Sequence, residues 1–224
     1  ALYVADFYNA VIGHYEVPLN NPRRDREKGR VWRIVYTGEG AKPLEPVNLR
    51  TADLAKLIHS LGSSNLTVRT LATNEILDRF RTPSDVIGPL HVAMAEPENA
   101  NRRVCGQWIL ERLSGLDDKT RDQLVNDQSP VVRTHLARLL SERPKWRTSE
   151  SKIAARFLSD ANAMVRRAAA DAAGRHPEVA FVEPLWKAWQ SADPKDAQLV
   201  HTARIALRNH LAALNIAEDP KVAD

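Results

Sequence analysis

The chain is poor in the residues and motifs that mark many enzymes and membrane proteins. Cys105 is the only cysteine among 224 residues, so no internal disulfide can form, and no Cys-x-x-Cys-His haem attachment motif is present. We expect Cys105 to serve in packing. No apolar run is long enough to span a membrane. A Gly-rich phosphate loop, a Gly-x-Ser-x-Gly elbow and a His-Glu-x-x-His pair are also absent, and no two histidines stand at close ligand spacing. The sequence therefore predicts no catalytic site and no metal site.

The excess of basic charge lies in one short segment. The whole chain has 32 Lys and Arg against 28 Asp and Glu. Residues 23–33 contain six basic and two acidic side chains, so this segment accounts for the net charge of +4 and the rest of the chain is neutral. We interpret the segment as a solvated connecting loop. Solenoids that bind nucleic acid need a basic face for the phosphates, and the neutral remainder disfavours that class without excluding it.

Five short segments of similar sequence recur along the chain. They place Arg69, Arg102, Arg133, Arg166 and His201 at intervals of 33, 31, 33 and 35 residues. A period in this range, followed each time by apolar residues at helical spacing, is typical of a solenoid of stacked helical pairs. A solenoid presents surfaces for binding, so it does not by itself indicate a reaction.

Acidic or hydroxyl side chains recur with the arginines. The residues six positions before the first four arginines are Ser63, Glu96, Asp127 and Asp160. An acid at the turn between two helices can accept hydrogen bonds from the first N–H groups of the next helix, and it can meet an arginine of the neighbouring repeat. We therefore predict a structural ladder, whose members are Glu96, Asp127, Asp160, Arg69, Arg102, Arg133 and Arg166.

The first helix of each pair is indicated by its cap and its apolar stripe. We expect the residues that open these helices to be Thr51, Ser84, Asp117 or Asp118, Thr148 and Pro177. Pro89 and Pro184 fall inside first-helix patterns, where a proline kinks or splits the helix. Kinked first helices are characteristic of HEAT repeats, which the five units resemble. We assign Trp186 and Trp189, three residues apart on one helical face, to packing between repeats.

The first part of the chain differs in kind. Residues 1–7 and 30–36 are rich in β-branched and aromatic residues that alternate as in strands, and a long irregular connection joins them. Two strands cannot form an independent domain. The predicted fold is mainly α: a short two-strand β segment in residues 1–45, an α-solenoid of about five HEAT-like helical pairs in residues 46–215, and a tail in residues 216–224.

The strand segment carries a family resemblance. The matching stretches are Leu2–Asn9, Ile12–His14, Pro22–Asp25 and Gly29–Ile34. They resemble the closing stretch of the β-propeller in the PVC-type membrane-bound dehydrogenases, also called PVC-type haem-binding CxxCH proteins. The motif positions are Asp6, Asn9, Gly13, His14, Arg24, Asp25, Gly29, Arg30 and Trp32. Phe7, Arg26 and Lys28 depart from the pattern of that family.

The resemblance implies that the chain is a fragment of a larger protein. In that family a propeller similar to the glucose/sorbosone quinoprotein dehydrogenases is followed by HEAT repeats and often by a cytochrome c domain. The parent would hold a quinone cofactor and haem c in the periplasm or cell envelope, with no cofactor in this segment. We therefore predict a non-catalytic scaffold that contacts other domains of the parent or a protein partner.

The alternative is a stand-alone HEAT-like protein that binds nucleic acid, or a DNA glycosylase. Such a protein would need a concave face lined by Arg and Trp side chains with a carboxylate among them. If the ladder arginines point into the stack, this alternative loses its best residues.

Overall fold

The structure is a computed structural model that describes residues 2–6, 10–11, 16–41, 47–80 and 82–214. The chain divides into two units, Ala1–Pro46 and Val47–Asp224, and each unit is described by itself. The tail predicted for residues 216–224 lies outside the described residues.

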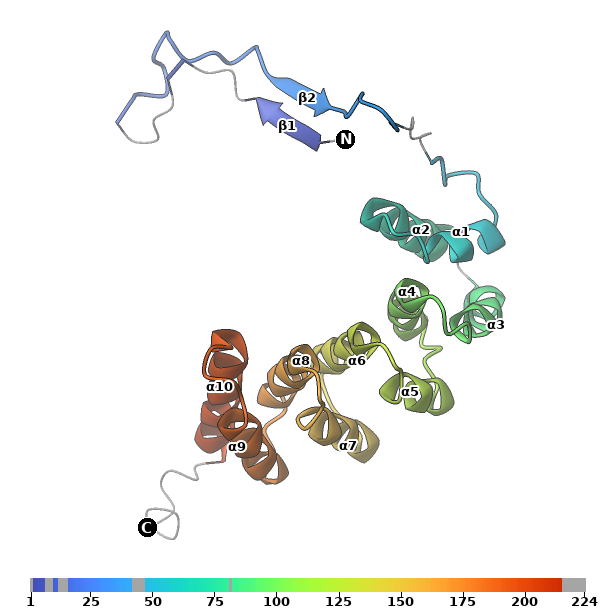
Figure 1. Ribbon diagram of the computed structural model, residues 1–224, viewed down its shortest axis with the longest axis vertical. Coiled ribbons are helices and arrows are strands. Elements are labelled where there is room, and N and C mark those ends of the chain that lie inside the picture. The colour runs from blue at the N-terminus through green and yellow to red at the C-terminus, as the bar shows by residue number, and fades with distance from the viewer. Residues whose placement is uncertain (1, 7–9, 12–15, 42–46, 81, 215–224) are drawn as a thin grey trace. The chain divides into compact units, whose positions relative to one another are not determined.

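The first unit contains one antiparallel pair of strands (Figure 1). β1 (Leu2–Asp6) pairs with β2 (Arg30–Ile34), and the register sets Leu2 opposite Ile34 and Asp6 opposite Arg30. The β-branched and aromatic residues of both strands favour an extended backbone. Their side chains are largely exposed, and even Trp32 keeps 51% of its surface open. A ribbon that buries so little apolar surface contributes little stability of its own.

The described part of the second unit contains ten α-helices arranged as five pairs. The first helices of the pairs are α1 (Leu54–Ser60), α3 (Pro83–Met94), α5 (Asp118–Val125), α7 (Thr148–Phe157) and α9 (Val182–Gln190). The second helices are α2 (Leu66–Arg79), α4 (Ala100–Arg112), α6 (Pro130–Glu142), α8 (Ala163–Gly174) and α10 (Ala197–Ala213). A 3₁₀ turn, η1 (Val179–Phe181), precedes α9. The prediction of a mainly helical chain after a two-strand segment is confirmed.

Short polar side chains begin most of the second helices. The capping residues Asn65, Asn99, Asn162 and Asp196 each accept a hydrogen bond from a backbone N–H in the first turn of α2, α4, α8 or α10. Helix α6 begins instead at Pro130, whose fixed φ suits the first helical position. These caps satisfy N–H groups that the helix itself leaves unpaired.

Several first helices begin at a different residue from the one predicted. Asp53, not Thr51, caps α1, because its carboxylate accepts the N–H of Lys56 at 2.8 Å. Thr82, not Ser84, precedes α3. Asp117 caps α5 as predicted.

Two further starts depend on residues that the prediction passed over. Helix α7 begins at Thr148 as predicted, but its capping residue is Arg147, whose N–H the Glu150 carboxylate accepts at 2.7 Å. In the last pair the chain enters a 3₁₀ turn at Val179, two residues beyond Pro177. The prolines act differently: α3 continues through Pro89, whereas Pro184 lies in the first turn of α9 directly after η1. A proline in a first turn costs no helical hydrogen bond, so α9 can begin just before Pro184. Among the described first helices, only that of the last pair is divided, into η1 and α9.

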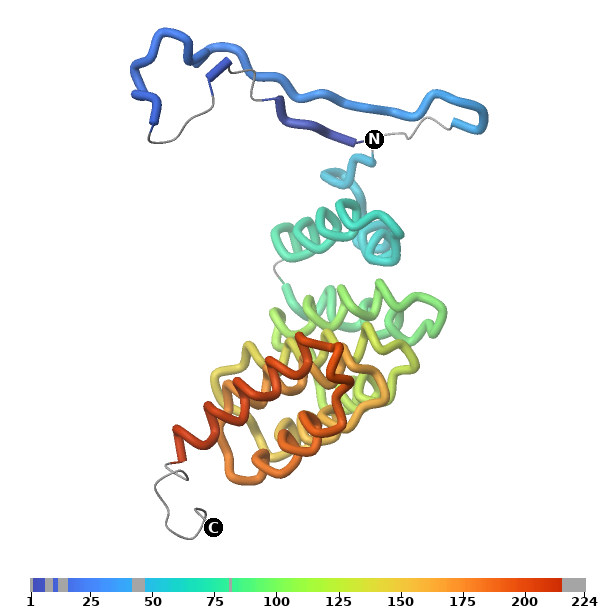
Figure 2. Tube along the Cα trace, turned by 60° about the vertical axis from the view of Figure 1, so that its left-hand side comes forward, coloured from blue at the N-terminus to red at the C-terminus, as the bar shows by residue number. Residues whose placement is uncertain are grey.

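The helices of the second unit form two rows (Figure 1). The second helices α2, α4, α6, α8 and α10 contact one another in that order, and each also contacts the first helix of its own pair. Figure 2 shows the same succession from green to red in a rotated view. Large apolar side chains fill the space between the rows, and those that are fully buried include Leu57, Ile76, Leu90, Ile109, Leu136, Phe157, Phe181 and Leu185. Each such side chain stabilises the fold by about 1.5–3 kcal/mol on burial.

Small residues allow neighbouring second helices to approach closely. Helix α8 is alanine-rich, and Gly174 ends it against α10. A Cβ on Gly174 would lie 3.1 Å from the Cα of Ala206, which is tighter than ordinary van der Waals contact. A side chain at this position would require Ala206 to shift by a few tenths of an ångström, so glycine suits the observed spacing of α8 and α10. Cys105 lies half-buried against the core, where burial raises the pKa of its thiol.

Candidate functional site

Arg133, near the start of α6, joins two successive inter-helix turns. Its Nε and Nη2 donate to the two carboxylate oxygens of Asp160 at 2.8 and 3.0 Å, and its Nη1 donates to the backbone carbonyl of Asp127 at 2.6 Å. The side chains of Arg133 and Asp160 are 17% and 11% exposed. The planar guanidinium matches a carboxylate with two parallel hydrogen bonds, so this contact fixes both distance and orientation between neighbouring pairs.

Each turn acid also shapes its own turn. One carboxylate oxygen of Asp160 accepts the backbone N–H of Asn162 at 2.8 Å, and Asp127 makes the same contact with the N–H of Ser129 at 2.8 Å. Burial alone would raise the pKa of Asp160, but the hydrogen bonds from Arg133 and from the Asn162 N–H outweigh it and hold that pKa below its usual range. The Asp160 hydrogen bonds raise the pKa of Arg133 in turn. The two groups therefore stay charged and paired.

The preceding contact between pairs, at Asp127, uses a different arginine from the one predicted. Arg103, not Arg102, donates to the Asp127 carboxylate, with Nε at 2.6 Å and Nη2 at 3.0 Å. Its Nη1 also donates to the carbonyls of Glu96 and Pro97 at 2.9 and 2.7 Å. Arg102 instead pairs with the Glu96 carboxylate inside its own pair.

The correction has a simple geometric reason. The arginines that bind a turn carbonyl are all the fourth residue of their helix, counted after the capping residue. By this count the equivalent positions are Arg69, Arg103, Arg133 and Arg166, followed by Val200 in α10. The sequence alignment on Arg102 and on His201 was therefore wrong by one residue in the second and fifth segments.

Two contacts of the ladder join an arginine to a carboxylate of the next pair, Arg103 to Asp127 and Arg133 to Asp160. The arginines before and after them make no such contact among the described residues. Arg69 donates to the Ser63 carbonyl at 2.6 Å, and Arg166 donates to the Asp160 carbonyl at 2.7 Å. The Nε of Arg166 is buried and has no hydrogen-bond partner among the described residues. Pro194 occupies the place, two residues before the cap, where earlier pairs have Asp127 and Asp160. The carboxylate that Arg166 would bind is therefore missing.

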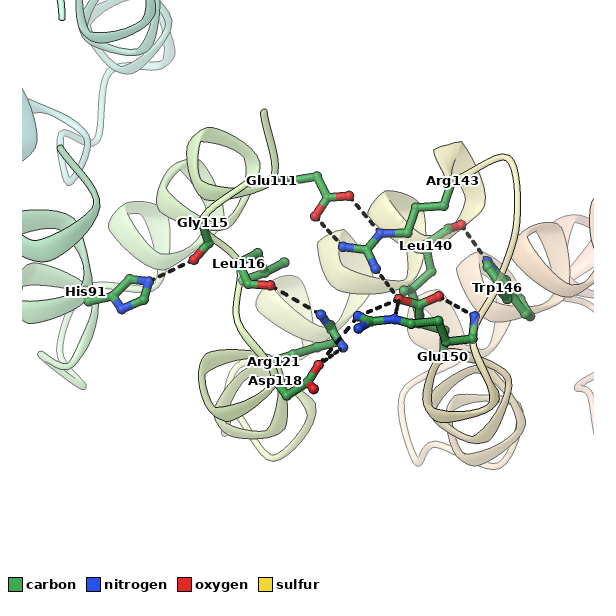
Figure 3. Close-up of polar contacts among 11 residues, drawn as sticks. His91, Glu111, Gly115, Leu116, Asp118, Arg121, Leu140, Arg143, Trp146 and Glu150 are labelled. Atoms are coloured by element: carbon green, nitrogen blue, oxygen red, sulfur yellow. Dashed lines mark hydrogen bonds and ion pairs between the residues drawn. The ribbon is translucent and has the colours of Figure 1, made fainter. Parts of the chain in front are cut away.

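A second charged network joins the middle pairs, and the sequence analysis missed it (Figure 3). Arg143, just after α6, makes a two-bond ion pair with Glu111 of α4, with Nε 2.7 Å from a carboxylate oxygen. Arg143 also pairs with Glu150 of α7, whose side chain is 1% exposed. Glu111 and Arg143 lie 32 residues apart and occupy different positions in their repeats, so the sequence period did not suggest the contact.

The same network extends to the start of α5. Arg147 contacts Glu150 at 3.1 Å and reaches Asp118 at 3.5 Å, and Asp118 pairs with Arg121 at 2.6 Å. Burial would raise the pKa of Glu150, but the backbone N–H of Arg147 and the charge of Arg143 outweigh it and hold that pKa low. A carboxylate that is ionised, buried and already accepting from two arginines is poorly suited to act as a general base. The network serves to hold α4, α5 and α7 together.

Three of the family-motif residues meet on the two strands, and a fourth lies in the loop that connects them. Trp32 Nε1 donates to Asp6 Oδ2 at 3.1 Å across the two strands, and the Arg30 guanidinium lies 5.8 Å from the Trp32 ring centre. Arg24 donates to the carbonyls of Val17 and Pro18 at 2.8 and 3.2 Å. These contacts orient the strand ends and the connecting loop.

The rest of the motif is divided between a turn and undescribed positions. Asp25 accepts the backbone N–H groups of Glu27 and Lys28 at 2.9 and 2.8 Å, just before Gly29. These two hydrogen bonds lower the pKa of Asp25. The motif positions Asn9, Gly13 and His14 lie outside the described residues.

The outer side of the last pair carries an apolar groove of about 1010 Å³. Trp186 and Trp189 of α9 lie edge to face in it, with ring centres 4.9 Å apart. Trp189 packs against the core, but Trp186 is 46% exposed. In the part of the chain that the structure describes, no helix covers Trp186, so its packing between repeats stays a prediction.

Comparisons with known proteins leave the site to be judged on its geometry. No protein-family model matches the chain, and no curated protein matches it significantly. Within the described residues, no group of three or more His, Cys, Asp or Glu side chains is placed to hold a metal ion. No helix in that part of the chain is long and apolar enough to cross a membrane.

Proposed function

We propose that this chain is a non-catalytic α-solenoid of HEAT-like helical pairs that serves as a scaffold for other domains or for a protein partner. The observation that carries the proposal is the arginine ladder. Asp127 and Asp160 each accept from an arginine of the preceding pair, while the turn carbonyl of each accepts from an arginine of its own pair. A contact repeated between successive units sets their spacing, which is what an extended scaffold requires.

The chemistry of the described charged groups supports a structural role. The carboxylates of Asp127, Asp160 and Glu150 are buried or nearly so, and each is engaged by arginine and by a backbone N–H. An acid–base catalyst needs a titratable group that can reach a substrate. Arg103 and Arg133 are likewise engaged by a carboxylate and by turn carbonyls, so they are not free to bind phosphates. This removes the best residues from the nucleic-acid alternative.

The parent protein remains a proposal that rests on resemblance. We propose that the strand unit is the end of a β-propeller from a PVC-type membrane-bound dehydrogenase, a family in which haem c and a quinone cofactor belong to other domains. The contact between Asp6 and Trp32 supports this proposal, because two motif residues 26 positions apart meet across the strands. A periplasmic or cell-envelope location and contact with the domains of the parent would follow.

The gene around this segment gives the most direct test of the parent. The proposal predicts coding sequence for the remaining propeller blades before Ala1 and a Cys-x-x-Cys-His motif after Asp224. A start codon close to Ala1 and a stop codon directly after Asp224 would contradict it.

A second test separates a protein scaffold from a nucleic-acid binder. Fluorescence anisotropy with a labelled 20-base-pair DNA duplex, at low and at physiological salt, should detect no more than weak binding that salt abolishes. Binding that persists at physiological salt and falls when Arg103 or Arg133 is replaced by glutamine would favour the nucleic-acid alternative.

A further inference from the structure

The groove on the last pair lies where an additional pair would pack. Its floor is formed by Val182, Trp186 and Trp189 from α9 and by Leu207 and Leu211 from α10. Solenoids usually end in a unit with a polar outer face, because an open apolar face invites association. This face has an apolar floor, and the charged side chains that line it are Glu183 of α9 and Arg204 and Arg208 of α10.

The face of α10 beside the groove differs from the same face of α6 and of α8. The eighth and twelfth residues of α6 are Ala137 and Ser141, and those of α8 are Ala170 and Gly174; all four are buried. The same positions of α10 hold Arg204 and Arg208, which are exposed. Gly174 shows how little room this face allows, since a single Cβ there would press on Ala206 of the next helix. Arg204 and Arg208 therefore give this face of α10 a charge that α6 and α8 lack there, whereas α4 holds Gln107 and Glu111 at the same positions.

These two arginines differ from those inside the stack. Neither Arg204 nor Arg208 forms an ion pair with any residue that the structure describes. The Arg204 guanidinium lies 5.9 Å from the ring centre of Trp189, and Arg208 donates to the Asn209 side chain at 3.0 Å. Arg103, Arg133 and Arg143 by contrast each bind a carboxylate from a different pair of helices or the loop beside it. The groove therefore offers two cations that lack carboxylate partners beside an apolar floor.

We propose that this groove binds an amphipathic helical segment of a partner protein, with apolar side chains on the floor and carboxylates facing Arg204 and Arg208. The inference rests on the proposed scaffold function and adds the chemistry of its ligand. A groove of about 1010 Å³ has room for several apolar side chains. The apolar stripe of a helix recurs every three to four residues, which suits a floor built along two helices.

A peptide fits the groove better than a nucleic acid does. Bases bind by stacking on open aromatic faces, but Arg204 covers one face of Trp189, and Trp186 meets Trp189 edge to face. Most of the floor is aliphatic, and the Glu183 side chain that lines the groove is paired with Lys187 at 2.6 Å. Binding to nucleic acid is therefore an outcome that counts against the proposal.

The test uses the full chain and two labelled synthetic helical peptides. Both carry the same leucine stripe, with glutamate flanking it in one peptide and lysine in the other. Anisotropy titrations should show the glutamate peptide binding at least tenfold more tightly. The double variant Arg204→Glu/Arg208→Glu should abolish or reverse this preference, and Trp186→Ala should weaken both peptides. The matched control Arg112→Glu/Lys152→Glu makes the same charge change at exposed sites of α4 and α7 and should leave the preference intact.

Several results would overturn the proposal. These are equal affinity for the two peptides, no binding of either, or a preference that the control variant removes as fully as the groove variant. Binding of a ten-nucleotide oligothymidine that Arg204→Glu/Arg208→Glu abolishes would assign the groove to nucleic acid. A dimer in sedimentation velocity that Trp186→Ala dissociates would assign it to a second copy of the chain. None of these results would touch the scaffold proposal, which depends on the ladder and on the neighbouring gene sequence.

Discussion

Replacing Arg133 with alanine tests whether the ladder holds the pairs together. The change removes the two hydrogen bonds to the Asp160 carboxylate and the one to the Asp127 carbonyl. Hydrogen bonds to charged groups contribute about 1.5–3 kcal/mol, and removal of one partner of a buried ion pair costs about 3–5 kcal/mol. Asp160 keeps its contact with the Asn162 N–H, and its side chain is 11% exposed, so water can partly replace the arginine. We therefore expect a loss of about 2–3 kcal/mol in the free energy of unfolding.

Urea denaturation followed by circular dichroism measures this loss, and the variant should also melt about 5–10 °C lower. Arg112→Ala is the matched control, because Arg112 is an exposed arginine on a second helix and should change stability by no more than about 0.5 kcal/mol. A double-mutant cycle with Asp160→Ala should give a coupling of about 1–2 kcal/mol. If Arg133→Ala costs no more than Arg112→Ala, or if the coupling is zero, the ladder does not stabilise the stack.

Three further predictions follow from the same contacts. Arg103→Ala should lower the free energy of unfolding, measured by urea denaturation, by at least about 1 kcal/mol more than Arg102→Ala. The first change leaves an Asp127 side chain that is only 8% exposed, whereas the second leaves a Glu96 side chain that is 60% exposed and already solvated. Equal losses would contradict the corrected alignment. Pro194→Asp should raise the unfolding midpoint by supplying a carboxylate for the buried Nε of Arg166, and an unchanged midpoint in the parallel control Pro194→Ala would separate this gain from loss of the proline. The pKa of Asp160 is lowered on folding, so its contribution to stability is complete above the ordinary value of 3.8 and is lost as the pH falls through the lower folded value; Asp160→Asn should therefore flatten the acid limb of the stability curve below about pH 4.

The helical part of the fold could be predicted because its signals are local. Apolar residues at helical spacing and Asp117 at a helix start act within a few turns of chain, and the period near 33 residues repeats these local signals from pair to pair. Helix starts that depend on several groups at once were less accessible. Arg147 became a cap because Glu150 reaches back to its N–H, and Asp53 displaced Thr51 because its carboxylate meets the Lys56 N–H.

The ladder shows where a one-dimensional pattern fails. Arg102 and Arg103 are adjacent, but a step of one residue turns a side chain by about 100° around the helix. The sequence period selected Arg102, whereas the cap at Asn99 orients Arg103 toward the next turn. The contacts from Arg143 to Glu111 and Glu150 join three separate elements, so no local pattern indicates them.

The sequence by itself determined the helical pairs, the two strands and the presence of acids at the turns, since each depends on short-range backbone preference or hydrophobic period. Only the tertiary structure decided which arginine crosses between pairs, which carboxylates are buried, and that Trp186 lies exposed in a groove among the described residues. The physical reason is that burial and ion pairing depend on which helix lies opposite a side chain. A contact such as that of Gly174 with Ala206 of α10 exists only once the helices have packed.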